Sequence, residues 1–96
     1  MTIDEVKKDL NDIRIFNSRK DFHAYINPDL RRRMQDKVDL YTSVVKQAPF
    51  DLQALFDEIY LKSNSQIAFC VNFGYCEKSI TRKKRDLEIF FKKNIH

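Results

Sequence analysis

Apolar residues recur every three or four positions along most of the chain, which is the spacing of one face of an α-helix. In the first segment these positions are Ile3, Val6, Leu10 and Ile13. Thr2 is a suitable N-cap, and acidic side chains follow it in the first turn, where they interact favourably with the helix dipole. The pattern predicts a first helix that reaches at least residue 14.

The segment after residue 14 leaves two interpretations open. Asn17 and Ser18 are weak helix formers, yet Phe22, Tyr25 and Ile26 resume an apolar face. We therefore expect either one long helix or a helix with an interruption in this segment.

A second helix begins at Asn27. Asn is a good N-cap, Pro28 fits the first helical position, and Asp29 follows in the first turn. The residue before a proline disfavours the helical conformation, so this helix ends before Pro49. Its apolar stripe is Leu30, Met34, Val38, Tyr41, Val44 and Val45. Arginines at positions 31–33 point in different directions around it, which favours a solvated surface over a patch for phosphates or a partner.

A third amphipathic helix starts at residue 50 and ends at residues 62–64. Its apolar positions are Leu52, Leu55, Phe56, Ile59 and Tyr60. Ser65 then caps a short helix over about residues 66–73, and Gly74 stands where the chain turns with a positive φ, which glycine adopts at least cost. A last helix covers about residues 77–93. Two helices joined by such a turn are typical of a helix-turn-helix.

Composition supports an all-α fold of four to five helices. The chain has 96 residues, of which 43% are hydrophobic, which is enough for one domain with a core. One Gly and two Pro leave little of the turn chemistry of β-hairpins. We expect residues 1–48 to form an N-terminal helical arm and possible oligomerisation region, and residues 49–96 a helix-turn-helix domain, packed as one compact unit. The arm either pairs two chains or folds back onto the second helix.

Membrane, metal and catalytic signals are absent from the sequence. No apolar run reaches the about 18 to 20 residues that span a bilayer, and the first residues lack the apolar centre of a secretory signal, so we expect a cytoplasmic protein. The spacing of Cys70 and Cys76 matches neither a redox pair nor a zinc site, and free thiols are expected. His23 and His96 are isolated and no Gly-rich phosphate loop exists, so neither an enzyme nor a bound cofactor is expected.

The net charge is concentrated at one end of the chain. Residues 77–96 contain seven Lys and Arg against three Asp and Glu, whereas residues 1–76 contain eleven of each. The formal charge of +4 therefore lies around the last helix. A basic run is usually only a solvated face, but its confinement to the second helix of a helix-turn-helix favours nucleic-acid binding.

Two faces of the last helix differ in character. The inner face holds Ile80, Leu87 and Phe91, with Phe90 beside them. Lys84 lies between Ile80 and Leu87, and only the stem of its side chain is expected to be covered. The outer face holds Lys78, Ser79, Arg82, Lys83, Arg85 and Asp86. The DNA-binding candidates are the five basic and hydroxyl residues of this face together with Thr81.

The candidates have different expected roles in DNA binding. A helix-turn-helix places its second helix in the major groove, with N-terminal residues at the base edges. Lys78, Ser79 and Arg82 are predicted to read bases, because Lys and Arg match the acceptors of guanine and Ser serves either partner. The other three suit phosphates or, for the threonine, a thymine methyl group.

These residues resemble a known type of DNA-binding domain. About a third of the chain is similar to region 4 of bacterial sigma factors and, more closely, to small phage-encoded regulators of late transcription of the ArpU and RinA types. The matching positions are Tyr60, Phe69, Cys70, Phe73, Gly74, Tyr75, Glu77, Ile80, Arg82 and Leu87. A weaker similarity covers VKKDLNDIR, residues 6–14.

The resemblance implies a sequence-specific regulator of transcription that is encoded by a phage or prophage. Such a regulator binds double-stranded DNA and contacts RNA polymerase. A homodimer is the usual way to bind two half-sites. Two positions depart from the pattern. Cys70 replaces the usual Ala, and Cys76 replaces the Ser or Thr cap of the recognition helix, which weakens that cap by about 1 kcal/mol. The alternative is a protein-interaction module whose basic helix binds a host protein, either RNA polymerase or a defence enzyme.

Overall fold

Helices are the only regular secondary structure in residues 2–19, 25–62 and 64–95, which are the residues that the computed structural model describes. In chain order the elements are α1 (Ile3–Ser18), α2 (Pro28–Val45), α3 (Phe50–Leu55), a π-helical segment η2 (Phe56–Leu61), α4 (Gln66–Phe73) and α5 (Glu77–Asn94). The predicted all-α fold of four to five helices is therefore confirmed.

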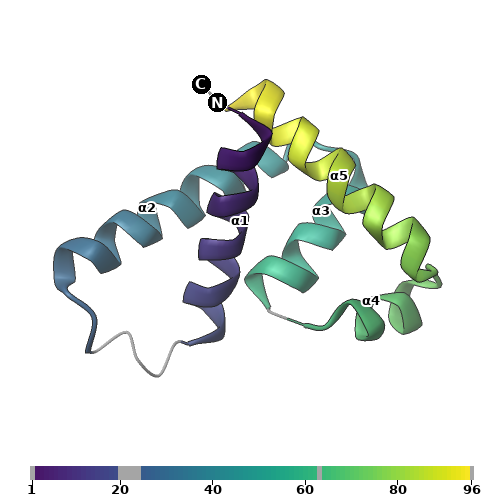
Figure 1. Cartoon of the computed structure of the whole chain (residues 1–96), viewed down its shortest axis with the longest axis horizontal. Helices are drawn as coiled ribbons and strands as arrows, with labels where there is room; N and C mark the ends of the chain where they lie inside the picture. Colours follow the sequence, from purple (N-terminus) through teal and green to yellow (C-terminus); the bar gives the residue numbers. More distant parts are fainter. Residues whose placement is uncertain (1, 20–24, 63, 96) are drawn as a thin grey trace.

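The N-terminal helix occupies a central position. Figure 1 shows α1 running down the middle of the molecule, with α2 on its left and α3 and α5 on its right. It packs against α2, η2 and α5, while α5 also contacts α2, α3 and α4. The segment expected to form an arm thus lies directly against the helix that carries the basic residues.

Capping side chains start three of the helices where the sequence indicates. The side chains of Thr2, Asn27 and Ser65 accept hydrogen bonds from backbone N–H groups two or three residues later, at 3.2, 2.8 and 3.1 Å. The first helix ends at Ser18, so the predicted helix to residue 14 is confirmed and continues by one turn. One long helix through residue 26 does not form, because Arg19 is the C-cap of the first helix. Residues 20–24, where the rest of this question falls, lie outside the described residues.

Aromatic side chains join three elements at the centre of the core. The ring of Phe91 from α5 is fully buried and lies 4.6 Å from the ring of Tyr41 in α2 and 5.5 Å from that of Phe56 in η2, measured between centroids. Such tilted and edge-on arrangements add about 0.5–1.5 kcal/mol per pair beyond the area buried. Phe91 is thus a central contact between the basic helix and the rest of the domain.

A polar cluster connects α1 to α2 beside this core. The hydroxyl of Tyr41 donates to Asp9 at 2.7 Å, and the ammonium of Lys37 lies 3.1 Å from Asp9 and 3.5 Å from Asp12. Burial and the neighbouring Asp9 raise the pKa of the Tyr41 phenol above its usual value. These contacts hold α1 against α2 within one chain.

The third helix differs from its prediction. One α-helix was expected from residue 50 to about residue 61, but its second half has the wider π-helical hydrogen bonding, with the Lys62 N–H donating to the Asp57 carbonyl at 2.9 Å. The side-chain amide of Asn17 donates to the Tyr60 carbonyl at 3.4 Å and to the Ile13 carbonyl at 3.0 Å. Asn17, a weak helix former, therefore contributes to the contact between α1 and η2.

Candidate nucleic-acid interface

A left-handed glycine joins α4 to α5. Gly74 has φ 74°, as predicted, and the N–H groups of Gly74 and Tyr75 donate to the Cys70 carbonyl at 2.9 and 3.2 Å. Figure 1 shows the chain turning sharply between the two helices at this point. A short helix, a turn at glycine and a longer helix give the order of elements of a helix-turn-helix.

The first helix of this pair has one buried ring, which belongs to a stack of three aromatic rings. Phe69 is the buried residue of α4, and its ring stacks on those of Phe73 at 4.6 Å and Tyr75 at 5.7 Å. Ile67 and Val71 are on the opposite side, 67% and 76% exposed. The helix α4 therefore contacts the core through the buried Phe69, with Cys70 and Tyr75 partly buried against it.

The inner face of α5 has the composition expected from the sequence. Ile80, Leu87 and Phe91 are fully buried, Phe90 is partly buried against the core, and Lys84 is half-buried. Lys78, Arg82 and Arg85 are exposed at spacings of four and three, so they follow one another along the outward face. This arrangement fixes which side of the basic helix is available to a partner.

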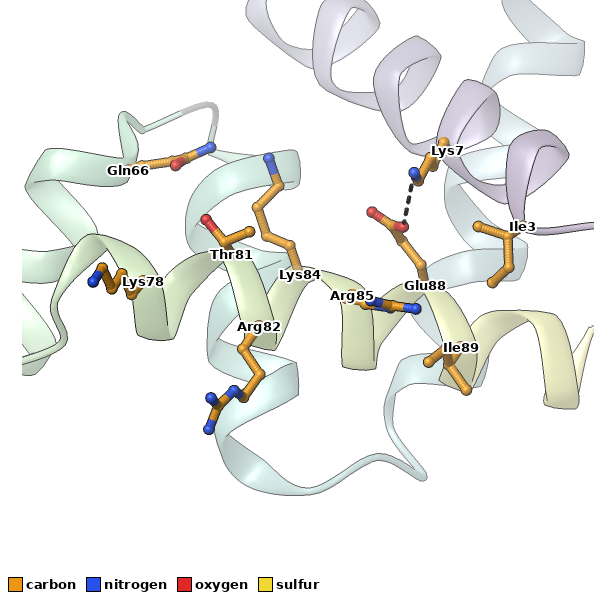
Figure 2. A pocket seen from close by; sticks show the side chains of 10 residues that line it. All are labelled: Ile3, Lys7, Gln66, Lys78, Thr81, Arg82, Lys84, Arg85, Glu88 and Ile89. Carbon is orange, nitrogen blue, oxygen red and sulfur yellow. Dashed lines mark ion pairs between the residues drawn. The ribbon is translucent and has the colours of Figure 1, made fainter.

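The six sequence-derived candidates separate into two groups. Four of them line a single open depression of about 690 Å³ at the junction of α5, the start of α1 and the start of α4 (Figure 2). These four are Lys78, Thr81, Arg82 and Arg85. Ser79 and Lys83 are half-buried and are engaged with other parts of the protein.

The lining of the depression is strongly cationic. Its residues are Ile3, Lys7, Gln66, Lys78, Thr81, Arg82, Lys84, Arg85, Glu88 and Ile89. Five of these carry a positive charge and one a negative charge, and all come from the described part of the chain. An open surface with this excess of cations attracts a polyanion.

Lys83 joins α5 to α3. Its ammonium group forms an ion pair and hydrogen bond with the carboxylate of Asp51, near the start of α3. The hydrogen bond from Lys83 lowers the pKa of the Asp51 carboxyl group, and the same bond raises the pKa of Lys83. The expected contact of Lys83 with the DNA backbone stays a prediction; in this structure its ammonium group links α5 to α3 through Asp51.

Replacement of Asp51 by Asn should therefore destabilise the protein in a pH-dependent way. Folding lowers the pKa of Asp51. The ion pair therefore stabilises the folded protein fully above the unfolded-state pKa of about 3.9, and this stabilisation is lost as the pH falls through the folded-state pKa. For a partly exposed pair we expect a loss of about 0.5–1 kcal/mol at pH 7, which shrinks as the pH falls below about 3.9.

Urea denaturation of the wild-type protein and Asp51→Asn at several pH values measures this difference. Asp36→Asn removes an exposed carboxylate of α2 and serves as the matched control, with little expected change. A constant difference between wild type and Asp51→Asn from pH 7 to pH 2 would contradict the ion pair as its cause.

The start of α5 shows the weak cap that the sequence indicates. Cys76 occupies the N-cap position but its side chain makes no capping hydrogen bond to the backbone. Its sulfur lies 3.2 Å from the hydroxyl oxygen of Ser79, and this hydrogen bond lowers the pKa of the Cys76 thiol. Cys70 and Cys76 are both free thiols, as predicted.

Sequence reasoning missed two cations of the depression. Lys7 comes from α1, and its ammonium group lies 4.0 Å from the carboxylate of Glu88 on α5, as Figure 2 shows. Lys84 was assigned to the covered side of α5, and its half-buried stem fits that assignment, yet it also lines the depression. The local signal for Lys7 is its spacing of four from Ile3, which also lines the depression.

Comparison with known protein families, with curated proteins and with solved structures finds no match to this chain. The resemblance to phage regulators and sigma factors therefore stays a prediction. Across residues 2–19, 25–62 and 64–95, no helix has the length and apolar character needed to cross a membrane.

Proposed function

We propose that this protein binds double-stranded DNA sequence-specifically and places α5 in the major groove. The observation that carries the proposal is the row of exposed cations Lys78, Arg82 and Arg85 on the second helix of a helix-turn-helix. These three are among the five cations that, with one carboxylate, line the depression. The N-terminal part of such a helix normally lies at the base edges.

The geometry supports a smaller set of base-reading residues than the sequence did. Lys78 and Arg82 lie in the first turns of α5 on its outward face and suit the guanine acceptors. Arg85, one turn further along, and Thr81, on the side of α5 near Gln66, suit phosphates. Ser79 and Lys83 are assigned to maintaining the position and start of α5.

The biological role follows from the resemblance to phage-encoded regulators. We propose a transcription regulator that acts in the cytoplasm, at a promoter where RNA polymerase is a possible second partner. Pairing of two chains would double the interface with DNA. An open, mostly apolar depression of about 580 Å³ between the end of α1 and the start of α2, with Ile15, Leu30 and Met34 in its lining, is the candidate surface for such a homodimer.

The salt dependence of DNA binding tests the proposal. Four to six phosphate contacts predict a slope of roughly −4 to −5 in a plot of log affinity against log salt concentration. Fluorescence anisotropy with duplexes selected from random DNA measures both affinity and slope. Failure to select any duplex, or tight binding that does not change with salt, would contradict the proposal.

A second candidate function is binding of a host protein. The exposed apolar side chains of Ile67 and Val71 on α4 favour it, because they lie on the helix next to the basic one and neither is suited to phosphate. Absence of duplex binding together with specific capture of RNA polymerase or a defence enzyme would favour this function over the first.

A further inference from the structure

We propose that the DNA-binding surface extends from α5 onto α1, where Lys7 and Lys84 together hold a backbone phosphate of the same duplex. This inference rests on the proposed DNA binding and adds a second, sequence-independent contact to it. It gives α1 a direct contact with DNA. A helix that served only to pair two chains or to pack against the core would need no such contact.

The first support is the continuity of the surface. A smaller depression of about 240 Å³ adjoins the large one, and both are lined by Lys7, Lys84 and Glu88. Arg14, further along α1, lines the smaller depression. Cationic side chains therefore follow one path from Lys78 on α5 across the junction to α1.

The second support is the arrangement of the two lysines. Lys84 extends from α5 between Gln66 and Glu88, and Lys7 enters from α1 on the other side of Glu88 (Figure 2). Within the described residues Lys84 forms no ion pair, and the contact from Lys7 to Glu88 is at 4.0 Å, the upper limit for one. An anion bound beside the two ammonium groups would give each lysine a closer counter-charge than it now has.

The dimensions of DNA explain why this contact is to the backbone. The major groove is about 12 Å wide and an α-helix with its side chains is about 10–12 Å across, so one helix fills it. With α5 filling the groove, α1, which packs against α5, has no room beside it there, and its side chains could reach only the sugar-phosphate strand. A lysine ammonium group there acts as a point charge for phosphate and reads no base.

Glu88 gives the inference a distinctive consequence. Its carboxylate is 12% exposed, is the acidic group in both linings and lies beside the proposed phosphate. Because the Glu88 carboxylate repels an anion there, Glu88→Gln should tighten binding by at least about two- to fivefold, which is the range measured for exposed charge pairs. A gain of affinity is informative because partial unfolding would produce a loss.

The experiment compares full-length variants on two duplexes, the selected sequence and a random one, by anisotropy over a range of salt. Lys7→Ala and Lys84→Ala should each weaken binding about three- to tenfold on both duplexes and lower the salt slope by about 1. Lys8→Ala, an exposed lysine one position away on α1, is the matched control and should change neither quantity. Circular dichroism verifies that each variant is folded.

The outcomes separate this inference from the proposed function. If the wild-type protein binds DNA but Lys7→Ala and Lys84→Ala keep its affinity and slope, the inference is wrong and the proposed function stands. Equal losses in Lys7→Ala and Lys8→Ala would also overturn it, because total charge would then account for the effect. If the wild-type protein binds no duplex, both fail together.

Discussion

Phe91→Ala is expected to lower the free energy of unfolding by about 3–5 kcal/mol, the largest effect on stability of any prediction made for this protein. The ring is fully buried and lies against Tyr41 and Phe56, so truncation leaves a cavity where α5, α2 and η2 meet. Domains of this size have a total stability of about 5–15 kcal/mol, and the variant should therefore melt far earlier than the wild-type protein.

Phe90→Ala is the matched control for Phe91→Ala. It removes the same atoms one position away, from a side chain that is only partly buried. Thermal and urea denaturation followed by circular dichroism should show a much smaller loss, about 1 kcal/mol. Similar losses of unfolding free energy in the two variants would contradict the assignment of Phe91 as a central contact of the core.

The double variant Lys78→Ala/Arg82→Ala is expected to weaken binding to a selected DNA site by about 2–6 kcal/mol, or roughly 30-fold to more than 10,000-fold. Each side chain is exposed on the outward face of α5, so its removal leaves the core unchanged. If each reads a guanine, its loss costs about 1–3 kcal/mol and relaxes the preference for that base.

Lys92→Ala/Lys93→Ala removes two positive charges from the last turn of the same helix and is the control for this effect. Competition binding with single-base variants of the selected site measures the preference at each position. Equal losses in the two double variants, with unchanged preference in both, would show that α5 acts through its total charge and not through base contacts.

Local features of the sequence were sufficient to predict most helix positions. Thr2, Asn27 and Ser65 were predictable as N-caps because a cap depends on a few neighbouring residues. Gly74 was predictable as the left-handed residue for the same reason. The inner face of α5 followed from its period, because Leu87 and Phe91 repeat on one side of the helix.

Features set by packing between distant segments could not be predicted. The π-helical turn buries the same side chains as an α-helix would, so periodicity alone does not distinguish them. Lys83 and Asp51 are 32 positions apart, and no local pattern indicates that they pair. The contribution of Lys7 to the depression likewise depends on how α1 lies against α5, which only the folded structure reveals.

The two helices of the helix-turn-helix differ in how firmly they are anchored. Three buried side chains and the contacts of Lys83 and Lys7 connect α5 to the domain, whereas α4 has Phe69 and its stacked neighbours. Local opening of α4 would therefore cost less free energy than opening of α5, and amide hydrogens in α4 would exchange with solvent sooner. We therefore expect α5 to keep its orientation when α4 opens locally.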